Sequence, residues 1–321
     1  MLNRRILRIK AFQILLSYAG NRAMTLEDAL AALDASCEAT RDLYLLMLSI
    51  AGPLTAEAAR RTEAASHKFN PTEEELHPNL KFVNNALAPL LAEDPDFKKL
   101  LERKKLSWEQ DDALVHDLYE TVKTRSYYAA YMADPEISLA QDVRLFKKIF
   151  EKEFEDNDAL RAILEDRNAF WAHDLPYALS CVIRSLDDVA KDGRWSLPPL
   201  YQSDMLAAEG KSVDSDRAFV RRLLTVAFGR FDEYYGKVAG SVEGWDRDRL
   251  FVTDIVTIAM GLAEAETFPE IPVKVTINEY VEISKYFSTP KSRSFVNGLL
   301  DRLIKESAAE GRINKAGKGL L

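Results

Sequence analysis

The chain has 321 residues, 47% of them hydrophobic, which is enough for one large or two ordinary domains with a real core, so disorder is not expected. Cys37 and Cys181 cannot supply a disulfide framework and are expected to be buried thiols, while no apolar run approaches the roughly 20 residues needed to cross a bilayer. We therefore expect a soluble cytoplasmic protein without a membrane partner, and the net charge of −8 at first argues against nucleic acid as a ligand.

The chain reads almost entirely as helix, because strictly alternating β-branched runs are missing and glycine and proline gather at breaks. This predicts an all-α fold. The first helix is expected at about 2–19, ending at Gly20-Asn21, and the next begins after the candidate N-cap Thr25 and is broken or kinked at Pro53. A loop at 70–78 precedes further helices at about 79–92, 94–105, 107–133, 138–155, 157–172 and 174–191.

The clearest linker is 192–200, where the adjacent Pro198 and Pro199 cannot continue a helix. After it, helices are expected at about 213–238, 246–265, 273–287 and 291–307, and the basic tail 311–321 is expected to be frayed. Asn297-Gly298 places two poor helix formers in the last helix, at a cost on the order of 1 kcal/mol. This indicates close packing on another helix or on a ligand.

Charge is distributed unevenly along the chain. Residues 1–26 carry five bases and no acid, and residues 271–321 carry nine bases and five acids, so the two ends together are +9 and the middle is −17. This asymmetry favours a cationic pole that faces RNA on an acidic body. The simpler alternative is that the helix faces merely differ in charge.

The first helix carries a basic cluster at its start. Arg4, Arg5 and Arg8 fall within a sector of roughly 100°, whereas Lys10 points elsewhere. Apolar residues surround much of the rest, which predicts an internal helix whose first two turns emerge as a basic prong. Guanidinium groups match phosphate oxygens and stack on bases, but a solvated helix start is an equally good interpretation from these residues alone.

A second basic cluster precedes the last helix. Lys291 and Arg293 can neutralise phosphates, Ser292 can bind a phosphate or cap the helix, and Phe295 can stack an unpaired base. An aromatic residue at helical spacing is more often core, and this alternative stays open for Phe295. Tyr18, at the end of the first helix, is a weaker candidate. Neither a nucleophile, a metal-ligand spacing nor a cofactor loop accompanies these residues, so we expect no enzyme activity and no cofactor.

Two segments of the chain match one known family pattern in order and spacing. The C-terminal matches are Pro272, Lys274, Val275, Ile277, Asn278, Glu279, Val281, Glu282, Lys285, Phe287, Ser292, Phe295, Val296, Asn297, Gly298, Leu300 and Asp301. With Arg4, Arg5 and Arg8 before Ala11–Leu15, which look like an arginine-rich first helix, these residues resemble the NusB family of transcription antitermination factors. Ser288 replaces a family glycine, and Lys291 stands where relatives are often acidic.

The resemblance implies a NusB-like helical bundle built from an N-terminal basic helix at 1–20 and a C-terminal region at 211–321, with a large helical insertion at 21–210. It implies binding of boxA-type single-stranded RNA together with the small-subunit ribosomal protein NusE. The complex would include NusA, NusG and RNA polymerase and promote antitermination, chiefly in ribosomal RNA operons. In NusB proteins the phenylalanine matching Phe295 contacts RNA. The predicted RNA-binding residues are Arg4, Arg5, Arg8, Lys10, Tyr18, Lys291, Ser292, Arg293 and Phe295.

Three other functions are compatible with parts of the sequence to different degrees. A ribosomal RNA methyltransferase with a NusB-like domain is disfavoured, because the NusB-like match ends this chain and neither cysteine follows a proline. A helical protein-interaction module dominated by the inserted block would make the basic ends incidental. An accessory RNA-binding protein of ribosomal RNA processing is a further alternative.

Overall fold

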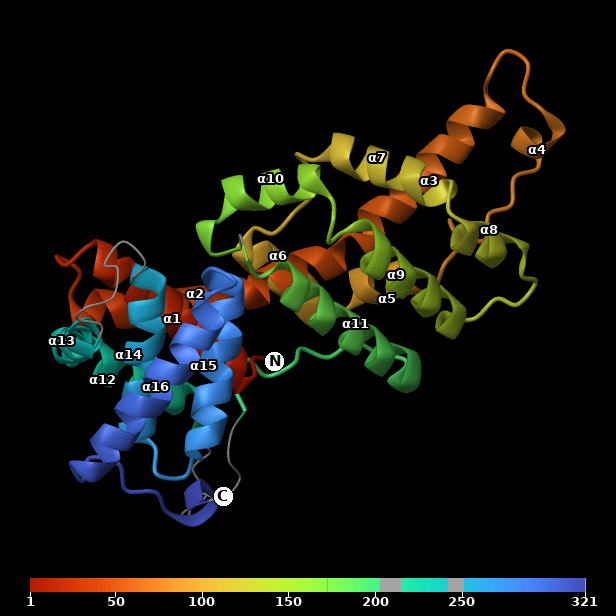
Figure 1. Ribbon diagram of the computed structural model, residues 1–321. Helices are drawn as coiled ribbons and strands as arrows, with labels where there is room; N and C mark the ends of the chain where they lie inside the picture. The colour runs from red at the N-terminus through yellow and green to blue at the C-terminus, as the bar shows by residue number, and fades with distance from the viewer. Residues whose placement is uncertain (172, 203–214, 242–250, 321) are drawn as a thin grey trace. The chain divides into compact units, whose positions relative to one another are not determined.

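The structure is a computed structural model that describes residues 1–171, 173–202, 215–241 and 251–320 (Figure 1). Every regular element within these ranges is a helix, which confirms the all-α prediction. The chain forms two compact units. We call residues 1–37 and 200–321 the terminal unit and residues 38–199 the central unit, and α2 (Leu26–Ser49) contributes residues to both.

The terminal unit is organised around one buried helix, α14. Its sequence is apolar on all sides, as is typical of a helix in the middle of a core, and every residue from Asp254 to Ala265 is buried. It packs against all the other described α-helices that lie wholly in this unit, and Figure 1 shows α14, α15 and α16 side by side. The elements are α1 (Arg4–Gly20), α12 (Ser215–Gly229), α13 (Phe231–Ser241), α14 (Val252–Thr267), α15 (Val273–Phe287), α16 (Ser292–Ala309) and the 3-10 turn η3 (Gly317–Leu320).

The glycine that allows close helix packing is Gly261, not Gly298. A Cβ at Gly261 would lie 2.7 Å from Leu300 Cδ2 and 3.3 Å from Tyr280 Cδ2, so α14 approaches α15 and α16 through this position. A Cβ at Gly298 would meet nothing within 4 Å. The prediction that Asn297-Gly298 packs on another helix is therefore wrong. Contact with a ligand is the remaining explanation for these two poor helix formers.

The central unit has an aromatic core. Phe82 packs against Tyr119, Tyr128 and Phe146, with ring centroids 5.4–6.1 Å apart. Its elements are the end of α2, α3 (Ala51–Ser66), α4 (Glu73–Leu76), α5 (Leu87–Glu93), α6 (Pro95–Lys104), α7 (Asp112–Lys123), α8 (Ser126–Ala133), α9 (Leu139–Glu153), α10 (Asp158–Arg167), the 3-10 turn η1 (Ala169–Trp171) and α11 (Leu175–Asp192). Cys37 in the terminal unit and Cys181 in the central unit are both buried, as expected.

Several helices begin or break at residues that no local sequence signal marks. The helix expected at 107–133 is interrupted at Arg125, whose backbone is extended and whose guanidinium makes two bonds of 2.9 and 2.7 Å to Glu153. The helix expected at 79–92 begins only at Leu87, because the Asn85 side chain accepts a hydrogen bond from Ala88 N at 2.9 Å. The helix expected at 213–238 breaks at Arg230, between α12 and α13. The structure does not describe residues 213 and 214, where this helix is expected to begin, or residues 246–250, where the next one is expected to begin. The predicted boundary at 210/211 also lies outside the described residues.

The C-terminal tail is anchored rather than frayed, so that expectation is wrong for the residues that follow α16. Lys315 Nζ donates to the carbonyls of Ala265 and Phe268, both at 2.9 Å, and Ala316 N donates to Pro269 O at 3.1 Å. The backbone of Gly319 lies so close to Pro269 that a side chain there would overlap it. The tail thus closes over the loop between α14 and α15.

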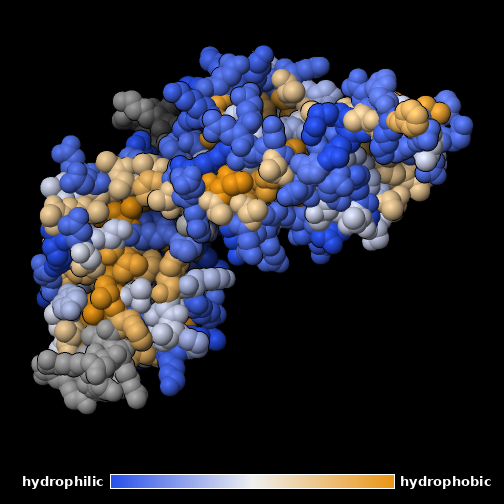
Figure 2. All heavy atoms as spheres, turned by 90° about the horizontal axis from the view of Figure 1, so that it is seen from above, coloured by the Kyte–Doolittle hydropathy of each residue, from blue (hydrophilic) through white to orange (hydrophobic). Residues whose placement is uncertain are grey.

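Hydrophilic side chains cover most of the face seen in Figure 2, and hydrophobic ones lie in smaller patches. None of the described helices is both long enough and apolar enough to cross a membrane. Residues 21–37, which the sequence analysis placed in the insertion, fall within the terminal unit. The division at 20/21 and 210/211 stays a prediction.

Candidate nucleic-acid interface

The start of α1 is fixed by two local contacts. The Asn3 side chain caps the helix by accepting a hydrogen bond from Ile6 N at 3.0 Å, and Leu2 N donates to Leu200 O at 2.9 Å. The first turn, with Arg4 and Arg5, is therefore held in a defined position.

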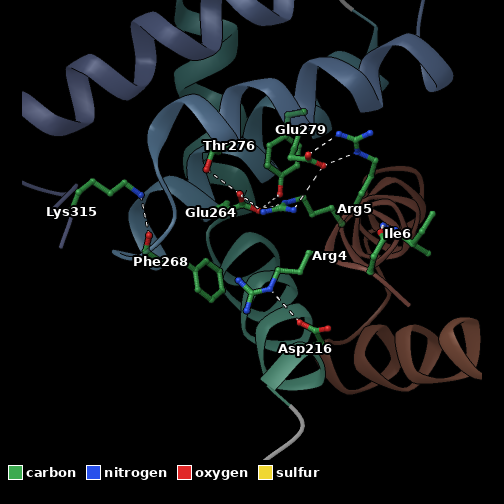
Figure 3. Close-up of polar contacts among 12 residues, drawn as sticks. Arg4, Arg5, Ile6, Asp216, Glu264, Phe268, Thr276, Glu279 and Lys315 are labelled. Carbon is green, nitrogen blue, oxygen red and sulfur yellow. Dashed lines mark hydrogen bonds and ion pairs between the residues drawn. The ribbon is translucent and has the colours of Figure 1, made fainter. Parts of the chain in front are cut away.

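Arg4 and Arg5 are half exposed, with 47% and 50% of their side chains accessible. Arg4 Nε donates to Asp216 Oδ1 at 3.2 Å, and its guanidinium lies 4.9 Å from the ring centroid of Phe219. Arg5 makes a bidentate bond to Glu279, with distances of 2.9 and 2.7 Å (Figure 3). The hydrogen bond to Glu279 raises the pKa of Arg5, and the bond from Arg5 lowers the pKa of Glu279. Both arginines are accessible, but each is engaged by a carboxylate.

Arg8 is buried, so its predicted place in an exposed prong is wrong. Its guanidinium bonds Glu264 at 2.6 and 2.9 Å, and the same carboxylate accepts from Thr276 Oγ1 at 2.9 Å and from Tyr280 OH at 3.1 Å. Burial acts to lower the pKa of Arg8, but the hydrogen bonds and charge of Glu264 outweigh it and hold that pKa above its ordinary value. Burial, reinforced by the charge of Glu264, raises the pKa of Tyr280 well above its usual range. This network joins α1 to α14 and α15.

Two further candidates of α1 lie inside the terminal unit. Lys10 is fully buried, so it is not accessible to a phosphate in this structure. Tyr18 is partly buried, and its ring packs against Phe228 with centroids 4.0 Å apart and against Phe231 at 5.6 Å. The guanidinium of Arg22 lies 4.5 Å from the Tyr18 centroid. Tyr18 therefore belongs to a packed aromatic cluster at the end of α1 away from Arg4 and Arg5.

The turn before α16 is held by a buried carboxylate. Asp254 accepts hydrogen bonds from Ser288 Oγ at 2.6 Å and from Ser292 Oγ at 2.9 Å. Burial raises the pKa of Asp254, and the two hydroxyls oppose that shift. Because Ser292 is buried and its hydroxyl is engaged, its expected contact with a phosphate does not fit this structure. The serine instead fixes the turn that carries Lys291 and Arg293.

Lys291 and Arg293 are both exposed, and within the described residues neither is within ion-pair distance of a carboxylate. Phe295 is partly buried. Glu282 on α15 bonds Lys285 and is influenced electrostatically by both Arg5 and Arg293. The two basic segments thus approach the same helix, but acidic side chains lie among them. The surface is mixed in charge, because the cationic pole expected from the sequence also carries Glu279 and Glu282.

One exposed aromatic residue was missed. Tyr286, in the last turn of α15, is 76% exposed and influences Arg5 electrostatically. The spacing of Glu279, Glu282 and Tyr286, three and four residues apart, puts all three on one face of a helix and could have indicated this position.

Comparison with known proteins points to one family. The model of the NusB family matches residues 180–305. A transcription antitermination protein NusB from Salinibacter ruber is 33% identical over 107 residues, covering 33% of this chain and 67% of that protein. The chain belongs to the NusB family.

Two other NusB relatives match shorter shares of their length. The NusB of Chloroherpeton thalassium is 31% identical over 103 residues, which is 32% of this chain and 49% of the relative. The NusB of Natranaerobius thermophilus is 38% identical over 77 residues, which is 24% of this chain and 53% of that relative. The chain thus spans about half the length of these two NusB proteins. No solved structure matches.

The NusB match begins within α11, at residue 180, and runs through α12 to α15 and the turn with Lys291 and Arg293 into α16, ending at residue 305. It does not include α1. The structure adds α1 to this region, because α1 packs on α12 and α14. The N-terminal arginines are therefore attached to the NusB-like segment although they lie more than 200 residues away in sequence.

Proposed function

We propose that this chain is an RNA-binding transcription antitermination factor that acts by binding and not as an enzyme. Its NusB relatives carry the name transcription antitermination protein, which supports the general role. The proposed ligand is boxA-type single-stranded RNA, bound with the small-subunit ribosomal protein NusE. NusA, NusG and RNA polymerase are the proposed further partners, in the cytoplasm and chiefly on ribosomal RNA operons.

The observation that carries the proposal is the placement of four exposed cations. Arg4 and Arg5 come from α1, and Lys291 and Arg293 come from the start of α16, which lies at the opposite end of the sequence. The two segments are connected through α14 and α15, because Arg5 bonds Glu279 while Ser292 bonds Asp254. Cations on a fixed scaffold can hold successive phosphates of one strand.

The roles we propose for the other predicted residues follow from their burial. Arg8 positions α1 through Glu264, and Ser292 positions the turn through Asp254. Neither is proposed to touch RNA in this conformation, and the same applies to Lys10. Phe295 and Tyr18 stay predicted RNA contacts. We also propose that residues 21–210 interrupt a NusB-like core formed by 1–20 and 211–321.

The experiment is a titration of the full chain with a boxA-type RNA and with a scrambled RNA of equal length, with and without the ribosomal partner. We expect tighter binding of the boxA-type RNA and a further gain with the partner. Replacing Lys291 and Arg293 by alanine should weaken binding of both RNAs, since phosphate contacts carry no sequence information. Equal affinity of wild type and this double variant would refute the proposed interface.

One observation favours a second function, a helical protein-interaction module. Arg4 and Arg5 already have carboxylate partners, so their charge is partly neutralised before any ligand binds. If Arg4→Ala and Arg5→Ala together with the Lys291 and Arg293 variants leave RNA affinity unchanged, the module without an RNA role is the better account.

A further inference from the structure

Tyr286 is unusual among the aromatic residues of the terminal unit. It is 76% exposed, whereas the next most exposed tyrosine described in that unit, Tyr235, is 44% exposed. Exposing a large aromatic ring forgoes the free energy of burying it, so the position calls for an explanation.

The backbone beneath Tyr286 is held on several sides. The ring of the adjacent Phe287 packs against Phe12 of α1, with centroids 5.1 Å apart. Ser288 N donates to Ser284 O at 3.0 Å, and the Ser288 hydroxyl bonds Asp254 at 2.6 Å. The exposed ring therefore stands on a fixed helix end, and little backbone entropy would be lost when a ligand packs on it.

The charges around the ring suit a polyanion. Tyr286 lies one turn beyond Glu282 and two turns beyond Glu279, and both of these carboxylates already have cationic partners, Lys285 and Arg5. Arg5 bonds Glu279 on this helix at 2.9 and 2.7 Å, and the turn with Lys291 and Arg293 follows the end of α15 in the chain. Cations thus accompany the carboxylates of the α15 face that carries the ring, and Lys291 and Arg293 follow the end of that helix.

An exposed ring accompanied by cations matches the chemistry of an unpaired nucleotide. The base stacks on the ring, whose face accepts any base, while the neighbouring phosphates meet the guanidinium and ammonium groups. An apolar protein partner would gain little from the surrounding charges, since charged residues are depleted at the centre of protein interfaces.

We propose that Tyr286 is a stacking platform for an unpaired base of single-stranded RNA. It lies on α15 between Glu279, the partner of Arg5, and the turn with Lys291 and Arg293 that follows the helix. This inference rests on the proposed RNA-binding function and adds a contact to it. Phe295, the aromatic residue predicted from the sequence, is more buried than Tyr286.

The test compares Tyr286→Ala and Tyr286→Phe with Tyr235→Ala as the matched control, using fluorescence anisotropy with a boxA-type RNA. We expect Tyr286→Ala to weaken binding by about 5- to 150-fold, as loss of one stacked base would. Tyr286→Phe keeps the ring and should bind within about twofold of wild type, as should the control. The slope of log affinity against log salt should not change, because no charge is removed.

A second measurement locates the stacked base. Single abasic substitutions are introduced along the RNA, and at one position the losses from the missing base and from Tyr286→Ala should not add. If wild type binds with a clear salt dependence but Tyr286→Ala has no effect, the inference fails and the proposed function stands. If Tyr286→Ala weakens only the complex formed with the ribosomal protein, the ring contacts protein and the inference is again overturned. If wild type binds no RNA, both fail.

Discussion

Arg5 and Arg8 lie three residues apart on α1, and each makes a bidentate bond to a glutamate, but their surroundings differ. Half of the Arg5 side chain is exposed, whereas only 4% of the Arg8 side chain is. An exposed pair contributes at most about 1 kcal/mol, while removing one partner of a buried pair leaves an uncompensated charge in the core. The same residue type therefore serves two purposes on one helix.

This difference in burial predicts that removing Arg8 destabilises the protein more than removing Arg5. Arg8→Ala should lower the free energy of unfolding by about 3–5 kcal/mol, because Glu264 would stay buried with only Thr276 and Tyr280 as donors. Arg5→Ala, the matched control, should cost less than about 1 kcal/mol. Urea denaturation followed by circular dichroism measures both. Similar losses for the two variants would show that Arg8 is not buried as described.

A carboxylate of the central unit predicts a pH effect. Glu57 is buried, and although burial acts to raise its pKa, hydrogen bonds from His116, Arg61 and Arg60 lower it to about 2. Since the folded pKa lies below the ordinary value of 4.5, folding favours the ionised form. The resulting stabilisation, on the order of 3 kcal/mol, is complete above about pH 4.5 and is lost as the pH falls towards 2.

Glu57→Gln tests this effect. The variant should be less stable than wild type at pH 7, and the difference should shrink between pH 4.5 and pH 2. Glu63→Gln, an exposed position of the same helix with no ion pair among the described residues, is the control and should follow wild type at every pH. A constant difference between Glu57→Gln and wild type across this range would contradict the assignment.

At the scale of elements, sequence patterns located helices better than their breaks. The helices expected at 94–105, 138–155 and 273–287 agree with α6, α9 and α15 within two residues at each end. The interruption at Arg125 has no glycine or proline to mark it, because it depends on a partner, Glu153, that is 28 residues away. Breaks set by tertiary contacts of this kind cannot be derived from local propensity.

Two glycines give a test at this scale. Gly261→Ala should destabilise the protein by about 1–3 kcal/mol, because the added methyl would lie 2.7 Å from the buried side chain of Leu300. Gly298→Ala should instead be stabilising by up to about 1 kcal/mol, since nothing lies within 4 Å and alanine is the better helix former. Thermal unfolding of the two variants distinguishes them. Stabilisation by Gly261→Ala would mean that α14 does not pack closely on α16.

At the scale of the whole molecule, the charge pattern of the sequence predicted where cations concentrate but not how they are paired. The ends of the chain do come together in the terminal unit, with α1 packed on α12 and α14. The partners Asp216, Glu264 and Glu279 all come from the C-terminal part of the chain, and a charge count by segment does not show which bases they engage. Of the predicted RNA-binding residues, four are exposed cations. The burial of Arg8, Lys10 and Ser292 could not be predicted from the sequence and is seen only in the structure.

The proposed interface depends on those four cations, Arg4, Arg5, Lys291 and Arg293. If each neutralises one phosphate, the plot of log affinity against log salt for a single-stranded RNA should have a slope of about −3. Replacing Lys291 and Arg293 by alanine should reduce the slope to about −1.5. Arg302 and Lys305, paired with Glu306 and Asp301 farther along α16, provide the control, and their replacement should leave the slope unchanged.

Measuring this slope for wild type and the two double variants is the most direct test of the interface. We expect a steep salt dependence of RNA affinity whose slope is halved when Lys291 and Arg293 are removed and unchanged when Arg302 and Lys305 are removed. A flat salt response of the wild-type protein, or an equal slope for all three proteins, would contradict it.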